Sequence, residues 1–422
     1  PKDHLSKGSW WEIFGDDQLN RLEKTALKNN HSLKSAMANV EKARAIARIS
    51  RSEFYPTVDL NPEWERSRTS KNNLTSTSAS ASSFIANHYS VPFDLSYELD
   101  LWGRVRRSFQ AGFAEVQATL AEFHTILLTL TADVAQTYFM IYELDKELYI
   151  LDETIKLRQY AHDMVAKRVE GGLTSELDFN RAKTELSKAK AERIDLVRRR
   201  KELEYSLAVL CGQLPGKFSV EKSKVELKAP LVPAGLPSEL LERRPDIAEA
   251  ERRVAAANAE IGVAKAAFFP SISLTTSGGF KSVSTDNLFD WESNFWSIGP
   301  SISVPLFAGG RNVANLEAKK AAYQEKVEDY RQTVMESFKE VETSLSNLFY
   351  RKEQFEAQNE VLESARNTAE LSISRYKQGL VSFLEVVDAE RSRLDAELES
   401  TQILKEQLIS SVQLIKAVGG RW

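Results

Sequence analysis

A cluster of charged side chains follows Leu384, about forty residues before the end of the chain. Glu385, Asp388 and Arg391 are spaced by three residues, so in a helix they lie on adjacent parts of one face. On a single chain such a cluster is usually a solvated helix face. The chemistry that this cluster could perform is electrostatic, because carboxylates attract cations and repel anions. The sequence contains no paired acid and base that would indicate catalysis.

Signatures of other chemistry are missing from the sequence. It contains no phosphate-binding loop and no nucleophile elbow, and its five histidines show no ligand-like clustering. The single cysteine, Cys211, excludes an internal disulfide and a cysteine-based zinc site. A net charge of −4, from 56 basic and 60 acidic residues, provides no basic surface for nucleic acid. We therefore expect no enzyme activity, no cofactor, no metal and no nucleic-acid partner.

The composition is that of a folded protein, with 42% hydrophobic and 27% charged residues in 422. No run approaches the roughly 18 consecutive apolar residues of a membrane-spanning helix. This does not exclude a β-barrel, whose strands give a weaker signal. The chain begins at Pro1 without a charged and then apolar leader, so we expect that any export signal has been removed.

The chain contains the same design twice. Gly103-Arg104 recurs 207 residues later as Gly310-Arg311, and Gly172-Leu173 recurs at the same offset as Gly379-Leu380. A period this long indicates a duplicated half-molecule rather than a solenoid. The predicted domains are an N-terminal segment (1–30), a first repeat (31–212), a linker (213–244) and a second repeat (245–422).

Each copy contains a predicted β-hairpin, at 54–101 and 268–307. The strands alternate strictly: in 89–101 the odd positions are apolar and the even ones mostly polar, which predicts one apolar and one wet face. Polar loops are expected at 67–83 and 282–294. Aromatic residues lie near the strand ends or on the apolar faces, as a membrane-interface girdle requires; they are Trp64, Tyr89, Tyr97 and Trp296, with Trp291 nearby.

Very long helices are predicted at 104–170 and 311–377. Each has 67 residues without proline and measures about 100 Å at 1.5 Å per residue. The apolar stripe of the first recurs at a mean spacing between the coiled-coil and straight-helix values, which favours side-by-side packing around a wide cylinder. Shorter return helices are expected at 174–211 and 381–418, and Ala-rich first helices at 31–53 and 245–267.

Four strands cannot close a barrel, and lipid does not tolerate open sheet edges. If these strands lie in a membrane, several chains must share one barrel, and three chains would supply twelve strands. We expect the helices to lack spare apolar surface, which disfavours a soluble coiled-coil scaffold, the alternative from another class.

Several motifs together, in order along the duplicated frame, resemble the outer-membrane efflux ducts of the TolC-like family, in the branch paired with resistance-nodulation-division pumps. The matching segments are Trp10-Trp11 to Leu19, Arg243 to Asp246, Ala264 to Ser273, Val304 to Arg311, Leu384 to Arg391 and Gly419 to Trp422. The resemblance covers essentially the whole chain. This branch usually carries a lipidated N-terminal cysteine, which would lie upstream of Pro1.

The resemblance implies a fold and a function. The fold is mainly α with a transmembrane β-barrel: a trimer whose 12-stranded barrel sits in the outer membrane of a Gram-negative bacterium on a long periplasmic α-helical barrel. The function is a passive exit duct for drugs and other small amphiphiles in a tripartite pump, with a periplasmic adaptor and an inner-membrane pump as partners. A type I protein-secretion duct is the nearer alternative, since the same architecture serves both.

Two groups of site residues follow from the resemblance. Leu384 and Asp388 match the family's aperture ring, with Glu385 beside them and Arg391 among the tethering residues, and threefold symmetry would turn each carboxylate into a ring of three. The glycine turns between the long and return helices would be the adaptor-docking sites; their residues are Gly171, Gly172, Leu173, Thr174 and Ser175, and Gly379, Leu380, Val381 and Ser382.

Overall fold

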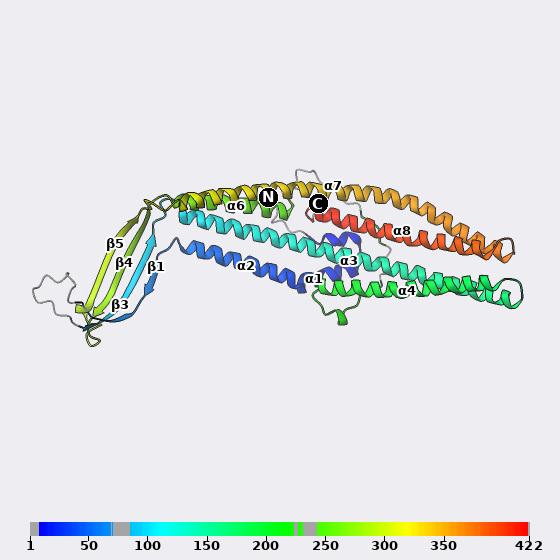
Figure 1. Ribbon diagram of the computed structural model, residues 1–422, viewed down its shortest axis with the longest axis horizontal. Coiled ribbons are helices and arrows are strands. Elements are labelled where there is room, and N and C mark those ends of the chain that lie inside the picture. Colours follow the sequence, from blue (N-terminus) through cyan, green and yellow to red (C-terminus); the bar gives the residue numbers. More distant parts are fainter. Residues whose placement is uncertain (1–7, 69, 71–84, 223–226, 231–242, 421–422) are drawn as a thin grey trace, which may run out of the picture. The chain divides into compact units, whose positions relative to one another are not determined.

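The computed structural model describes residues 8–68, 70, 85–222, 227–230 and 243–420. The expected polar loop at 67–83 and the terminal Arg421-Trp422 lie mostly or wholly outside these residues. Figure 1 shows the helices and strands of the chain, which forms two compact units. One consists of residues 1–39, 120–249 and 331–422, and the other of residues 40–119 and 250–330.

The second unit contains one antiparallel sheet. Its strands are β1 (Thr57–Leu60), β2 (Glu63–Arg68), β3 (Ile85–Glu98), β4 (Ser271–Ser282) and β5 (Asn294–Ser303). Both β1 and β2 pair with β3, which pairs with β4, which pairs with β5. Strand β3 thus joins the hairpin of the first copy to that of the second. The prediction of a single strand at 57–64 is wrong in one respect, because the segment is divided into β1 and β2 around Pro62. The proline ring leaves no backbone N–H to donate to the neighbouring strand.

The strand register places all the apolar rows on one face of the sheet. Val58 lies opposite Leu95, and Trp64 opposite Tyr89. Further along, Tyr97 lies opposite Leu274, and Ile272 opposite Ile302. The reverse face carries the polar rows, such as Asp59, Asp94, Ser277 and Ser297 in mutual register. The predicted alternation thus runs through β1, β4, β5 and residues 89–98 of β3, whereas β2 beyond Trp64 carries Arg66 and Arg68 on the same face.

A proline in the middle of β3 is accommodated by a glycine. Pro92 lies opposite Gly279, and a Cβ added at Gly279 would stand 2.1 Å from the Val91 carbonyl oxygen. Proline normally lies at sheet edges because it cannot donate to the ladder. The close backbone approach at Gly279 allows this central strand to keep its place.

The helices have the lengths expected from the duplication. Helices α3 (Arg104–Glu170) and α7 (Arg311–Lys377) each have 67 residues, and α4 (Glu176–Leu210) and α8 (Phe383–Ala417) each have 35. The return helices thus begin two residues later than the expected 174 and 381. The other helices are η1 (Trp10–Phe14), α1 (Asp17–Asn29), α2 (His31–Ser52), η2 (Pro215–Lys217), α6 (Pro245–Ala266) and η3 (Trp291–Ser293). The division into two sequence repeats with a linker stays a prediction.

Within the first unit, α4 runs back alongside α3, and α8 runs back alongside α7 (Figure 1). Ion pairs join both antiparallel pairs: Arg200 of α4 bonds Asp145 of α3 at 2.7 Å, and Arg366 of α7 bonds Glu397 of α8 at 2.9 Å. Apolar stripes face each other between the helices, for example Leu144 and Leu151 of α3 with Leu196 of α4. The result is two helix pairs, α3/α4 and α7/α8.

The main core of this unit fixes the N-terminal segment to the helix pairs. Trp10, Phe14 and Leu19 are buried together with Phe139 of α3 and Leu408 of α8. Asp16 caps α1 by accepting from the Gln18 amide at 2.7 Å, and it also accepts a 2.5 Å hydrogen bond from the Tyr138 hydroxyl. A single carboxylate thus both starts α1 and attaches it to α3.

The expectation that the helices lack spare apolar surface is wrong for the isolated chain. Helix α7 buries few of its residues, and large apolar side chains on it are exposed, including Met335, Phe349, Val361 and Leu371. An amphipathic stripe is satisfied only when another element covers it. These side chains are therefore surface that a single chain leaves uncovered.

Among the described residues, none of the helices combines the length and apolar character needed to cross a membrane.

Candidate functional site: the helical turns, the charged cluster and the sheet face

Both helix pairs end in the same glycine turn. At Gly172 φ is +68°, and the Leu173 amide bonds the Arg168 carbonyl at 2.8 Å. At Gly379 φ is +76°, and the Leu380 amide bonds the Arg375 carbonyl at 3.0 Å. This is the geometry of a Schellman cap, in which a glycine takes the left-handed conformation after the last helical turn. The two predicted turns are thus structurally equivalent.

The tips of these turns present leucine side chains to solvent. Leu173 is 78% exposed and Leu380 is 63% exposed. Gly171, Ser175 and Ser382 are also exposed, whereas Thr174 and Val381 are partly covered. An exposed leucine at the same position of two equivalent turns is surface that a protein partner could bury.

Only one of the two serines caps its return helix through its side chain. The Ser175 hydroxyl accepts from the Asp178 amide at 3.4 Å, and the Thr174 hydroxyl donates to the Asp178 carboxylate at 2.7 Å. Ser382 makes no side-chain cap bond, and its carbonyl accepts from the Glu385 amide instead.

The predicted gate residues lie in the first two turns of α8. Leu384, Glu385 and Asp388 are exposed, while the intervening Phe383, Val386 and Val387 are buried. The buried side chains hold this face of α8 against α3, α4 and α7, and they leave the charged side chains pointing away. The structure therefore keeps Asp388 free of the ion pair that its neighbour Arg391 makes.

Arg391 pairs with Glu185 of α4. Its guanidinium donates to the Glu185 carboxylate, which also lies 3.4 Å from the guanidinium of Arg158 in α3. Arg158 donates in addition to the Glu185 carbonyl at 2.8 Å. The hydrogen bond from Arg391 lowers the pKa of Glu185 despite partial burial. A largely buried carboxylate thus joins three helices, α3, α4 and α8.

A second contact joins the helix pairs nearer the turns. The Arg168 guanidinium of α3 lies 4.7 Å from the centre of the Tyr376 ring in α7 and donates to the Tyr376 carbonyl at 3.5 Å. The sequence did not indicate Arg168, Tyr376, Glu185 or Arg158 as site residues. The contacts of Arg168 with Tyr376 and of Glu185 with Arg391 span 208 and 206 residues, and no local motif marks these residues or Arg158.

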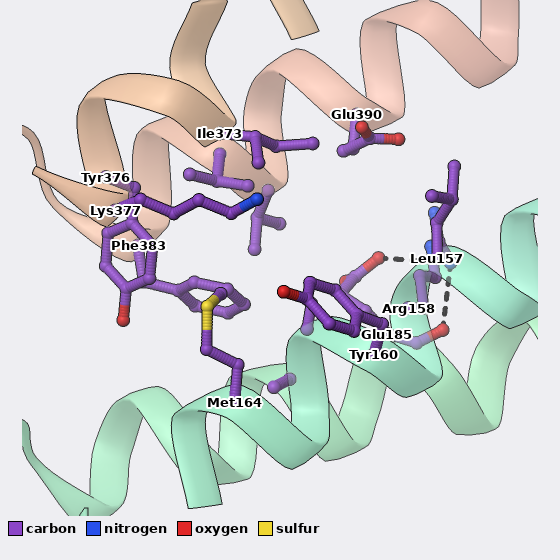
Figure 2. A pocket seen from close by; sticks show the side chains of 14 residues that line it. Leu157, Arg158, Tyr160, Met164, Glu185, Ile373, Tyr376, Lys377, Phe383 and Glu390 are labelled. Carbon is purple, nitrogen blue, oxygen red and sulfur yellow. Dashed lines mark hydrogen bonds and ion pairs between the residues drawn. The ribbon is translucent and has the colours of Figure 1, made fainter. Parts of the chain in front are cut away.

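A cavity of about 170 Å³ lies between the two helix pairs, next to these contacts. Figure 2 shows Leu157, Tyr160 and Met164 of α3 on one side, and Ile373 and Tyr376 of α7 with Phe383 of α8 on the other. The Arg158–Glu185 pair closes one end. The packing between the pairs is therefore incomplete at this level.

The predicted interface aromatics all lie on the apolar face of the sheet. Trp64 and Tyr89 face each other across β2 and β3, Tyr97 lies near the other end of β3, and Trp296 stands opposite Gly278. Trp296 is 76% exposed and Trp64 62%. Tryptophan and tyrosine are the residues that membrane proteins place at lipid–water interfaces.

These features define a class of protein: paired long helices ending in glycine turns, joined to a sheet with one exposed apolar face, as in outer-membrane channels. Comparison with known proteins agrees. The family model described as "Outer membrane efflux protein" matches residues 22–213 and 236–420. The chain belongs to this outer membrane efflux protein family.

Individual relatives match over nearly the whole chain. It is 36% identical to the solvent efflux pump outer membrane protein SrpC of Pseudomonas putida, over 97% of this chain and 87% of that one. It is 33% identical to the cation efflux system protein CusC of Escherichia coli, over 100% and 90%. The structure matches the outer-membrane channel OprN with a TM-score of 0.92 at 29% identity, over 98% and 92% of the two chains.

The protein is thus an outer-membrane channel of an efflux system in a Gram-negative bacterium. The predicted mainly helical fold with a β-sheet domain, the role as outer-membrane channel of an efflux system and the outer-membrane location are confirmed, and the trimer stays a prediction.

Proposed function

We propose that three copies of the chain form one duct, which performs no chemical step. The observation that carries this proposal is the sheet. Its apolar face is exposed, and within the described residues β1 and β2 at one edge and β5 at the other have no further strand beside them. Unpaired backbone groups are costly in lipid. Pairing between the edges of neighbouring chains satisfies them, and three chains give a closed 12-stranded barrel within the known size range.

The helices support the same assembly. The exposed apolar side chains of α7 need a protein neighbour in the periplasm, and the equivalent helices of two further copies supply one. The helix pairs then surround a common axis as an α-helical barrel. Polar sheet residues such as Ser277 and Ser297 line the bore, so small molecules leave through water.

We propose that the gate is the ring of Leu384, Glu385 and Asp388 side chains around that axis. Arg391 holds each α8 to the α3/α4 pair through Glu185. Three Asp388 carboxylates facing one axis favour cations and repel anions. The gate opens when the α7/α8 pair moves away from α3/α4, which breaks the Arg391–Glu185 and Arg168–Tyr376 contacts.

We propose that a periplasmic adaptor docks on the two glycine turns and links the duct to an inner-membrane resistance-nodulation-division pump. The exposed Leu173 and Leu380 support this assignment, because a partner gains apolar contact at two equivalent points of each chain. SrpC and CusC are named for solvent and cation efflux, respectively. We assign drugs and other small amphiphiles to this duct, with selectivity set by the pump.

Native mass spectrometry of the detergent-extracted protein tests the assembly, and drug resistance of a duct-deficient Gram-negative strain tests the function. We expect a mass of three chains, and resistance that requires the adaptor and the pump. A monomer in detergent contradicts the shared barrel, and failure to restore resistance with any co-expressed resistance-nodulation-division pump contradicts the function.

A further inference from the structure

The cavity between the helix pairs has the size of a small-molecule site. Its volume is about 170 Å³, and an apolar protein cavity of about 150 Å³ is large enough to bind benzene. Its walls are largely apolar and rich in aromatic rings, namely those of Tyr160, Tyr376 and Phe383. A single six-membered ring fits such a space, and edge or offset contacts with the surrounding rings stabilise it.

The charged side chains around the cavity are paired, with one exception. Arg158 is paired with Glu185, and Glu390 is paired with Arg393 at 3.0 Å. Lys377 also lines the cavity, and the described residues provide no acid to pair with it.

The position of Lys377 directs its charge toward the space. Figure 2 shows its side chain extending from α7 across the cavity toward Tyr160 of α3, and its Nζ lies 5.7 Å from the centre of the Tyr160 ring. The empty space thus has an aromatic wall and one uncompensated ammonium group. An anionic group on a bound ring would accept a charge-assisted hydrogen bond from this ammonium group.

We propose that this cavity is a binding site for small aromatic carboxylates, with the ring between Tyr160 and Phe383 and the carboxylate on Lys377. The bound molecule contacts α3 and α7 together, so it bridges the two helix pairs. An aromatic cation would face the same ammonium group unfavourably, and a neutral ring would leave it unpaired. The proposal concerns binding alone and does not depend on the gate assignment.

Benzoate is the probe, titrated onto the full-length protein in lipid nanodiscs and followed by saturation-transfer difference NMR, with empty nanodiscs as the blank. We expect saturable binding to the wild type and an affinity about tenfold lower for Lys377→Gln, because one charge-assisted hydrogen bond is lost. Lys377→Arg should retain most of the affinity. Arg375→Gln, which removes a neighbouring exposed cation outside the cavity, should bind as the wild type does.

Two further measurements separate the ring from the charge. Benzyl alcohol, which has the same ring without the anion, should bind the wild type as weakly as benzoate binds Lys377→Gln. Ala161→Phe places a second ring in the cavity and should abolish binding. If that variant does not fold, the exposed Lys377 variants still decide the matter. The proposal is overturned if benzoate binds the wild type and Lys377→Gln with equal affinity, or if benzyl alcohol binds the wild type as tightly as benzoate does. It is also overturned if benzoate shows no saturable binding to the wild type.

Discussion

Arg391 in α8 donates a hydrogen bond to the carboxylate of Glu185 in α4, which lies 206 residues earlier in the chain. Glu185 is largely buried and is also paired with Arg158. The contact fastens the helix that carries the proposed gate to the opposite helix pair. Buried charges are destabilising when they lose one partner, so this pair is a sensitive point of the proposed gate.

Replacement of Glu185 should loosen the gate. Glu185→Gln leaves two arginines without their carboxylate, at a cost of about 1–3 kcal/mol, and the open fraction should rise about tenfold. Single-channel recording in planar bilayers measures this. Glu192→Gln, which removes an exposed carboxylate on the same helix, is the matched control, and equal open fractions in the two variants would contradict the assignment.

Acid should have the same effect on the wild type. The pKa of Glu185 is lowered from its ordinary value of 4.5, so the pairing is fully present above that value. It is lost as the pH falls through the lowered pKa. Channel opening due to Glu185 should therefore be constant from about pH 7 to pH 5 and rise only as the pH falls below the ordinary value and through the lowered pKa. The recordings should show no such rise in Glu185→Gln.

Asp388 should determine ion selectivity. Asp388→Asn removes the proposed ring of three carboxylates and should lower the cation-to-anion permeability ratio, measured as the reversal potential across a salt gradient. Glu363→Gln, which neutralises an exposed acid on α7, should leave the potential unchanged. An unaltered reversal potential in Asp388→Asn would remove this residue from the conduction path.

The glycine turns should be needed for efflux and not for assembly. A Cβ atom added at Gly172 or Gly379 meets no neighbouring atom within 4 Å, but a β-branched residue is strained at positive φ by about 1–3 kcal/mol. We expect Gly172→Val and Gly379→Val to reshape the tips and abolish drug resistance while trimers persist. Asn, which tolerates this conformation, should be milder, and Gly216→Val, where φ is ordinary, should be silent. Full resistance with both valines would place docking elsewhere.

Glu23 should make the protein less stable as the pH rises above 4.5. Its side chain is fully buried in α1, and neither carboxylate oxygen has a hydrogen-bond partner. Burial therefore raises its pKa well above 4.5. A raised pKa favours the protonated form in the folded state, so stability falls as pH rises above the unfolded value. The Tm of the wild type should drop by a few degrees between pH 5 and pH 8. The drop should be smaller in Glu23→Gln, whereas the exposed control Glu12→Gln should show a larger drop than Glu23→Gln.

The sequence predicted the elements because their signals are local. Alternation in 89–101 and the repeated Gly-Leu turns indicated strands, helices and their order. Because the pattern recurs at a fixed offset, each element was predicted twice, once in each copy. The break at Pro62 was also readable from the proline itself. The resemblance then supplied the proposed gate and docking residues, which no periodicity could identify.

The contacts between helix pairs could not be read in this way. Glu185 and Arg391, like Arg168 and Tyr376, meet only after the chain has folded back twice, and each residue alone looks like one more polar or aromatic position on a long helix. The exposed apolar side chains of α7 were missed for a related reason. Apolar periodicity shows that a face will be covered, but not whether the same chain covers it.

Thiol labelling on β5 tests the central claim, that lipid covers one face of the sheet and water the other. Ser297 and Ile298 are adjacent, point to opposite faces and are both exposed in the single chain. The native Cys211 is buried, and burial raises its pKa to about 12, so it stays silent. In proteoliposomes, a charged maleimide should label Ser297→Cys quickly and Ile298→Cys at least about tenfold more slowly, because thiolate forms only in contact with water. Equal labelling of both positions would contradict the duct.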